Sequence, residues 1–254
     1  MKNKKKYGQF YTTNCNYILT NISIPSGSIL IEPFVGQGDL ITWSGLTDWE
    51  MYDIDPKITT AITRDTLLNP PDYKGKYVVT NPPFLAKNKN KDKRVYDLYK
   101  VNDLYKAAIK SFVDGEVEGG ILIIPLNFFC DRDKNIRDLF FQEYNVDKVN
   151  VFEETVFDDT SYTVCSFAFD KKPFDGNIEF TFYPTKDTEV FVLEKEHGWK
   201  IGGSIFKKVE SKYKLGRLLD GDNPTTNIFL QAIDTGTEEG RIKLIANHEL
   251  FYDK

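Results

Sequence analysis

The chain has 254 residues, of which 41% are hydrophobic and 28% are charged, a balance typical of a globular protein with one main domain and a smaller appendage. Its net charge of −5 disfavours a uniformly phosphate-binding surface but allows basic patches. No leader sequence and no apolar run of ~18 residues is evident, so we expect a soluble intracellular protein without a membrane span. The two histidines and the separated Cys15, Cys130 and Cys165 lack zinc-ligand spacing, so we expect no metal site.

Strand-like and helix-like segments alternate along the first two-thirds of the chain. Apolar runs predict strands at 28–33, 49–55, 76–83, 119–125, 146–152 and 163–169. Helical spacing predicts a short helix ending at Trp43, a helix over 102–113 behind an Asn102 N-cap, and a helix over 133–144. This alternation predicts an α/β fold with an open, mainly parallel sheet, in which ligands bind beyond the carboxyl ends of the strands.

The pattern changes near 171–176, where Lys-Lys-Pro precedes Asp-Gly. The segments 178–183 and 189–194 are strand-like, and a polar stretch with Gly-Gly, Asp-Gly and Asn-Pro turns follows them. We therefore predict a catalytic domain over 1–172 and a small β-rich extension over 173–254.

The tetrapeptide Asn81-Pro82-Pro83-Phe84 directly follows a predicted strand. Prolines donate no backbone hydrogen bond and fix the chain direction, so the carbonyl groups and the Asn81 side chain can accept hydrogen bonds. Two acceptors suit the two hydrogens of an aromatic amino group and make its nitrogen more nucleophilic, while Phe84 can stack on a flat substrate. A rigid turn at the end of a strand is the alternative interpretation.

Glycines and acids follow the first two strands. Gly36 and Gly38 permit close approach of a ligand before a helix start, and Glu32 can receive an ammonium group. Asp53 or Asp55, at the end of the second strand, suits two ribose hydroxyls. Asp65 can accept from an adenine amino group or serve only as a turn residue.

These motifs together resemble the S-adenosylmethionine-dependent DNA adenine N6-methyltransferases of restriction–modification systems and viruses, in the arrangement that places the cofactor-binding segment first. The resemblance covers about residues 7–170 and is strongest in YGQFYTT, IEPFVGQG, YDIDP and NPPF. It implies a Rossmann-like methyltransferase fold with a mixed, mainly parallel seven-stranded sheet flanked by helices. It also implies S-adenosylmethionine as cofactor, S-adenosylhomocysteine as product, and a location in the cytoplasm of a bacterium or of a virus-infected host cell.

The resemblance also implies roles for individual residues. Cofactor binding falls to Tyr7, Thr12, Thr13, Glu32, Phe34, Gly36, Gly38, Asp53, Ile54, Asp65 and Asn81. Catalysis falls to Asn81, Pro82 and Phe84, with Phe84 and Phe157 enclosing a flipped-out adenine. Phe157 also fits an ordinary core position.

The lysine-rich stretch after the tetrapeptide resembles a mobile loop near DNA. Its basic side chains are expected to contact phosphates of double-stranded DNA: Lys87, Lys89, Lys91, Lys93 and Arg94. Such a cluster is also compatible with an ordinary solvated face. The extension occupies the place of a target-recognition domain; it is small for that task, so recognition is expected to be minimal, truncated or completed by a second subunit. A cognate restriction endonuclease is a further expected partner.

Two other functions remain open from the sequence. Methyltransferases of structural RNA and of protein glutamine also use an Asn-Pro-Pro-aromatic tetrapeptide. A catalytically silent DNA-binding or partner subunit would keep the fold, although such a chain has no chemical need for Asn81, Phe84 and Asp53 together.

Overall fold

The computed structural model describes residues 11–131, 133–157, 162–201, 229–233 and 241–245. The chain divides into two compact units, Met1–Lys208 and Val209–Lys254. In the second unit, β10 (Phe229–Ile233) and β11 (Arg241–Ile245) form an antiparallel pair. No helix among the described residues is long and apolar enough to cross a bilayer.

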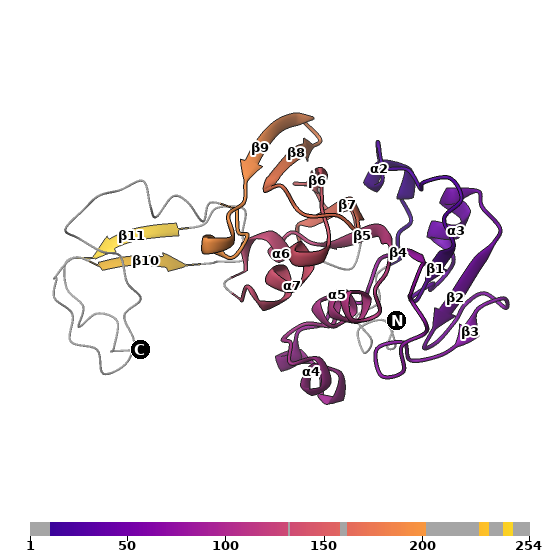
Figure 1. Cartoon of the computed structure of the whole chain (residues 1–254). Helices are drawn as coiled ribbons and strands as arrows, with labels where there is room; N and C mark the ends of the chain where they lie inside the picture. The colour runs from indigo at the N-terminus through magenta and orange to yellow at the C-terminus, as the bar shows by residue number, and fades with distance from the viewer. Residues whose placement is uncertain (1–10, 132, 158–161, 202–228, 234–240, 246–254) are drawn as a thin grey trace. The chain divides into compact units, whose positions relative to one another are not determined.

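The first unit is built on one nine-stranded sheet in the order β3-β2-β1-β4-β5-β7-β6-β8-β9 (Figure 1). The strands are β1 (Leu30–Glu32), β2 (Trp49–Asp53), β3 (Ile62–Thr63), β4 (Tyr77–Thr80), β5 (Gly119–Pro125), β6 (Lys148–Phe152), β7 (Val164–Asp170), β8 (Asn177–Tyr183) and β9 (Asp187–Val192). Strands β1 to β5 run parallel, and β7 runs antiparallel to both β5 and β6. The predicted mixed, mainly parallel α/β sheet is confirmed.

The sheet has nine strands rather than the expected seven, because the start of the extension continues it. Strand β8 pairs parallel with β6, and β9 returns antiparallel beside β8. The alternation in β8, where Ile178 and Phe180 are buried, provides the apolar face that this pairing needs. The predicted division at 172/173 therefore falls between two strands of one sheet, whereas the compact units divide after Lys208.

Helices lie on both faces of the sheet (Figure 1). They are α2 (Cys15–Ile18), α3 (Asp39–Ser44), α4 (Arg94–Tyr99), α5 (Leu104–Asp114), α6 (Asn127–Cys130) and α7 (Asn135–Glu143), with the 3₁₀ turns η1 (Lys87–Lys89) and η2 (Lys195–His197). Helix α5 begins one residue later than expected, with Asp103 rather than Asn102 as its N-cap. The sequence pattern did not predict β3, α2, α4 or α6, all of which have six residues or fewer.

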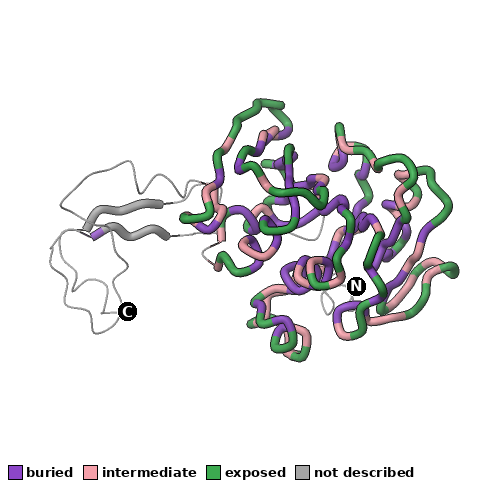
Figure 2. The backbone as a smooth tube through the Cα atoms, in the orientation of Figure 1, coloured by how far each residue is buried: buried purple, intermediate pink, exposed green. Residues whose placement is uncertain are grey.

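Alternate residues of the central strands belong to two separate cores, one on each face of the sheet. Ile31, Val78 and Leu122 pack in the core that includes α5 and α7. Their sequence neighbours Leu30 and Val79 pack in a second core with residues of α2 and α3. Side chains on a strand alternate between faces, so a strand buried on both faces is apolar throughout. Figure 2 shows that these central strands are buried. The packed strands fix the positions of the polar residues at their carboxyl ends.

Candidate active site

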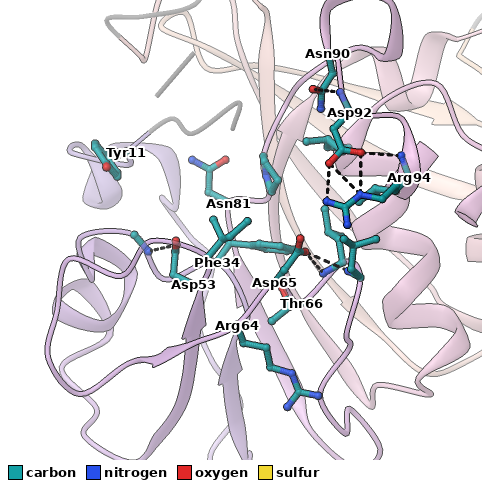
Figure 3. Close-up of a pocket in the computed structure, with 17 residues that line it drawn as sticks. Tyr11, Phe34, Asp53, Arg64, Asp65, Thr66, Asn81, Asn90, Asp92 and Arg94 are labelled. Carbon is teal, nitrogen blue, oxygen red and sulfur yellow. Dashed lines mark hydrogen bonds and ion pairs between the residues drawn. The ribbon is translucent and has the colours of Figure 1, made fainter. Parts of the chain in front are cut away.

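A cavity of about 310 Å³ opens at the carboxyl ends of β1, β2 and β4 (Figure 3). Its volume lies at the lower end of the ~300–1,000 Å³ usual for small-molecule sites. Its lining combines apolar and polar side chains from segments far apart in the sequence: Tyr11, Phe34, Gly36, Asp53, Ile54, Arg64, Asp65, Thr66, Leu67, Leu68, Asn81, Pro83, Asn90, Asp92, Arg94, Val95 and Leu104. The structure thus brings the predicted Phe34, Gly36, Asp53, Ile54, Asp65 and Asn81 together.

Asp53 organises the loop between β1 and α3. Its Oδ2 accepts a hydrogen bond from the Gly36 amide at 2.9 Å, and its Oδ1 accepts one from the Asp55 amide at 2.8 Å. Gly36 has a φ of +52°, and a Cβ there would lie 3.1 Å from Cε1 of Tyr11. The glycine therefore allows the loop to turn tightly under Tyr11. Gly38, with a φ of +82°, is the N-cap of α3.

Glu32 lies at the end of β1 and is buried. Its Oε1 accepts hydrogen bonds from the Phe34 amide at 3.0 Å and from the Thr80 hydroxyl at 2.5 Å. Its Oε2 is buried and accepts no hydrogen bond from the described residues. Burial raises the pKa of Glu32 to about 8, with hydrogen bonds from Thr80 and Phe34 opposing the shift. A cationic ligand group beside Oε2 would favour the charged carboxylate.

Asp65 and Ile54 line the same cavity. Oδ1 of Asp65 accepts hydrogen bonds from the amides of Leu67 and Leu68, at 3.2 and 3.1 Å, so Asp65 does serve as a turn residue. It also lines the cavity, as Phe34 does (Figure 3). The Ile54 side chain is 41% exposed, which leaves apolar surface available to a flat ligand. Asp55 instead pairs with Lys57 at 2.6 Å.

The side chain of Asn81 is held in one orientation at the end of β4. Its Nδ2 donates a hydrogen bond to Oγ1 of the buried Thr12 at 3.0 Å. Figure 3 shows Asn81 between Tyr11 and the segment that carries Asn90 and Asp92. Because Nδ2 is engaged by Thr12, an amino group of a ligand would meet the acceptor Oδ1.

The two aromatic residues expected to enclose a base do not line the cavity. Phe84 is 3% exposed and packs edge-on against Tyr105, with ring centroids 6.3 Å apart. Phe157 is 4% exposed and belongs to the second core. Of the two prolines, Pro83 lines the cavity and Pro82 is buried.

The basic segment after the tetrapeptide forms η1 and α4. Lys87 pairs with Asp97 at 2.6 Å, and the Lys93 amine donates to the backbone carbonyls of Lys87 and Asn90. Lys89 and Lys91 are exposed. Arg94 pairs with Asp92 and lines the cavity. The exposed members of the predicted phosphate-binding cluster are thus Lys89, Lys91 and Arg94, and Arg94 lines the cavity as well.

Thr13 is exposed beside the buried Thr12. Tyr7 lies outside the described residues.

No sequence motif predicted a ligand-binding role for Arg64, Asn90, Asp92 and Val95, which are among the residues that line the cavity. Arg64 directly precedes the predicted Asp65, so its place at the cavity could have been predicted from that neighbour. The other three follow no strand end, so no sequence signal placed them at the cavity.

The donors and acceptors of the site fit an adenine nucleoside that carries a methionine chain. Asp53 and Asp65 supply carboxylate oxygens at the cavity, and Ile54 and Pro83 supply apolar surface. Glu32 does not line the cavity; its buried Oε2, which no described residue satisfies, would match an ammonium donor. In the described part of the chain, no cluster of three or more His, Cys, Asp or Glu side chains is arranged to hold a metal ion.

No protein-family model and no curated protein sequence matches the chain. Solved structures do match, with low sequence identity. A modification subunit assigned to a type I restriction enzyme from Vibrio vulnificus YJ016 aligns with a TM-score of 0.54 at 13% identity, over 79% of this chain and 52% of that one. The type I restriction-modification methyltransferase subunit from Streptococcus thermophilus aligns with a TM-score of 0.50 at 15% identity, over 81% and 55%.

A DrdV–DNA complex also matches, with a TM-score of 0.54 at 13% identity, over 78% of this chain and 32% of that one. The chain spans about half the length of the first two relatives. At these identities the similarity establishes the fold, and the chain has the Rossmann-like fold of these restriction-modification methyltransferase subunits.

Proposed function

We propose that the chain transfers a methyl group from S-adenosylmethionine to N6 of a flipped-out adenine in DNA, with sequence specificity. The observation that carries the proposal is Asn81 at the rim of a nucleoside-sized cavity, with its amide nitrogen hydrogen-bonded to Thr12. This arrangement supports a role for Asn81 Oδ1 as the acceptor for the target amino group. The fold shared with methyltransferase subunits supports the same conclusion.

The chain's own residues would act by positioning and by accepting hydrogen bonds. Asn81 Oδ1 and the Pro82 carbonyl would each accept one hydrogen of the target amino group, which localises the nitrogen lone pair. S-adenosylmethionine would supply an electrophilic methyl group on its sulfonium. Glu32 would hold the ammonium, Asp53 the ribose hydroxyls and Asp65 the adenine amino group. The proton of the target nitrogen leaves after transfer, so no general base is assigned.

Substrate binding would require the adenine to leave the duplex, at a cost of a few kcal/mol. Stacking on Phe84 would return about 1–3 kcal/mol, with Phe157 as the proposed second ring. Because Phe84 is 3% exposed here, its ring would have to be uncovered when DNA binds. The exposed Lys89 and Lys91, with Lys87 and Lys93 beside them, would contact flanking phosphates.

The relatives suggest a partner as well. Two of them are named as subunits of type I restriction-modification systems, and this chain covers only about half of each. We propose that a second subunit completes target recognition, with residues 173–254 contributing to it. A restriction endonuclease would be the functional counterpart.

The test is the Asn81→Ala variant. Loss of one acceptor in the transition state should lower methyl transfer to duplex DNA by about 10²–10³-fold. Binding of S-adenosylhomocysteine, measured by calorimetry, should stay near the wild-type value. Thr12→Val, which removes the acceptor for Nδ2, should cause a smaller loss of the same kind. Turnover of Asn81→Ala at the wild-type rate would contradict the mechanism.

The same assay identifies the substrate. Wild-type protein is given duplex DNA, structural RNA and a release-factor protein with labelled cofactor, and the product nucleoside or residue is identified by mass spectrometry. Label in N6-methyladenine of DNA supports the proposal. Label in RNA or in glutamine replaces it with one of the two other amino methylations, and failure to bind cofactor indicates a silent subunit.

A further inference from the structure

One wall of the cavity comes from a segment for which nothing in the motifs predicts a role in ligand binding. Asn90, Asp92, Arg94 and Val95 all line it, although they lie between the tetrapeptide and α5 (Figure 3). From the sequence, Arg94 is one of five basic residues of this stretch that are expected to contact DNA phosphates. The structure places Arg94 at the same cavity as Asp65.

This wall is anchored to the tetrapeptide by hydrogen bonds. Tyr96 is fully buried, and its hydroxyl donates to the carbonyl of Leu85 at 2.8 Å, directly after Phe84. Asn90 Nδ2 donates to the same tyrosine oxygen at 3.1 Å, and Asn90 Oδ1 accepts from the Asp92 amide at 3.1 Å. The position of the wall is therefore tied to the chain directly after the tetrapeptide.

Asp92 and Arg94 form a closely matched pair on this wall. The Arg94 guanidinium contacts the carboxylate through Nη2 at 2.7 Å and through Nε at 3.1 Å to each oxygen. The Arg94 amide also donates to Asp92 Oδ1 at 3.0 Å. The hydrogen bonds from Arg94 lower the pKa of Asp92 to about 2. A planar guanidinium held in this way has a defined orientation but keeps donors for a second partner.

The charge opposite this pair is Asp65. The pKa of Arg94 is raised chiefly by Asp92, with a smaller contribution from Asp65. Oδ1 of Asp65 already accepts two amides, so Oδ2 has the greater capacity for a ligand amino group. A purine bound there would lie between the apolar Ile54 and Val95 and would reach Arg94 with its ring face or its ring nitrogens.

We propose that Asn90–Val95 forms the wall that closes the cavity over an adenine nucleoside, with Arg94 retaining the nucleoside rather than contacting a DNA phosphate. The inference rests on the proposed function for the identity of the ligand. Asp92 acts as the positioning residue for Arg94. Because the wall is bonded to the chain just after the tetrapeptide, nucleoside binding and the geometry at Asn81 are coupled.

The experiment compares two ligands by calorimetry. S-adenosylhomocysteine carries the amino-acid chain, and 5′-methylthioadenosine carries the nucleoside without it. Arg94→Ala should weaken the binding of both ligands by a similar factor of roughly tenfold, which is the loss expected for one interaction with a charged group. Asp92→Asn should cause a smaller loss for both. Lys91→Ala, an exposed cation of the same segment that does not line the cavity, is the matched control and should leave both affinities unchanged.

DNA binding provides the opposing readout. The slope of DNA affinity against salt concentration should fall for Lys91→Ala and stay at the wild-type value for Arg94→Ala. Unchanged nucleoside affinity in Arg94→Ala, or a lowered salt slope without a loss of nucleoside affinity, would overturn the inference while leaving the proposed function intact. Wild-type protein that binds neither ligand would overturn both. Thermal unfolding of each variant checks that the exposed substitutions leave the fold intact.

Discussion

The acids of the site have structural as well as ligand-binding capacity. Asp53 and Asp65 each accept two backbone amide hydrogens from neighbouring loops, and each carboxylate retains further lone pairs. A substitution at either position therefore changes the loop and the ligand contact together. For variants of Asp53 or Asp65, stability therefore has to be measured together with ligand binding.

Asp53→Ala is expected to weaken binding of S-adenosylhomocysteine by about tenfold to a hundredfold, because both the proposed ribose contacts and the hydrogen bond to the Gly36 amide are lost. Calorimetry measures this change. Asp53→Asn keeps one acceptor oxygen, so its affinity for S-adenosylhomocysteine should lie between those of the wild type and of Asp53→Ala. Asp55→Ala is the control, because Asp55 pairs with Lys57 instead of lining the cavity. Equal losses at positions 53 and 55 would contradict the assignment of the ribose site.

Glu32 predicts a pH dependence of stability. Its pKa is about 8 in the folded chain against an ordinary value of 4.5, so the folded state binds more protons between these values. The stabilisation from protonated Glu32 is complete below about pH 4.5 and is lost as the pH rises through 8. The free energy of unfolding of the wild type, relative to Glu32→Gln, should fall across that window by at most about 1.4 kcal/mol per pH unit.

Urea unfolding of the two proteins at several pH values measures this difference. Saturating S-adenosylmethionine should make the dependence shallower, because an ammonium beside Oε2 favours the carboxylate. A difference that stays flat from pH 5 to pH 8 in the ligand-free protein would contradict the burial argument for Glu32.

At the scale of elements, the close packing of β4 against β5 carries Asn81 to its place. Strand β5 begins with Gly119-Gly120, which pair in register with Tyr77 and Val78. A Cβ built on Gly120 would lie 2.4 Å from the Val78 carbonyl oxygen and 2.5 Å from Val78 Cγ1. A side chain at Gly120 would therefore push apart the two central strands.

Gly120→Ala is expected to lower the free energy of unfolding by about 3 kcal/mol or more, because backbone atoms must shift to admit the methyl group. Gly27→Ala is the control: Gly27 has a φ of +82°, and a Cβ there has no heavy atom within 4 Å. That change should cost only the backbone strain of about 1–2 kcal/mol. Urea unfolding midpoints compare the two, and a smaller effect at Gly120 than at Gly27 would refute the packing argument.

At the scale of the whole molecule, every described residue that lines the cavity belongs to the unit Met1–Lys208. Strands β8 and β9 belong to the same sheet as the cavity strands, although they follow the predicted division at 172/173. Cofactor binding should therefore depend on residues up to 208 and not on those beyond.

A chain ending at Lys208 is expected to fold and to bind S-adenosylhomocysteine with wild-type affinity, whereas a chain ending at Lys172 should lose stability because β6 loses its neighbour β8. Circular dichroism and calorimetry check both. If residues 209–254 take part in target recognition, the chain that ends at Lys208 should also lose sequence-specific DNA methylation. Stable folding of the shorter chain would show that the sheet extension is dispensable.

The sequence alone was sufficient to predict the features that depend on the chemistry of neighbouring residues along the chain. Apolar runs marked the central strands, since strands buried on both faces must be apolar throughout. Glycines and acids at the ends of these runs marked Gly36 and Asp53, and the double proline marked Asn81. In a parallel sheet the carboxyl ends of strands share one edge, so position along the chain was enough to bring these residues together.

Only the tertiary structure decided the features that depend on packing between distant segments. The expectation that Phe84 stacks on a substrate rested on its ring alone, but its burial beside Tyr105 depends on α5. The pairing of β8 with β6 depends on which edge of the sheet is open. The proposed role of Arg94 has the same origin: its charge is visible in the sequence, but the cavity that it lines exists only once the carboxyl ends of β2 and β4 and the segment Asn90–Val95 come together.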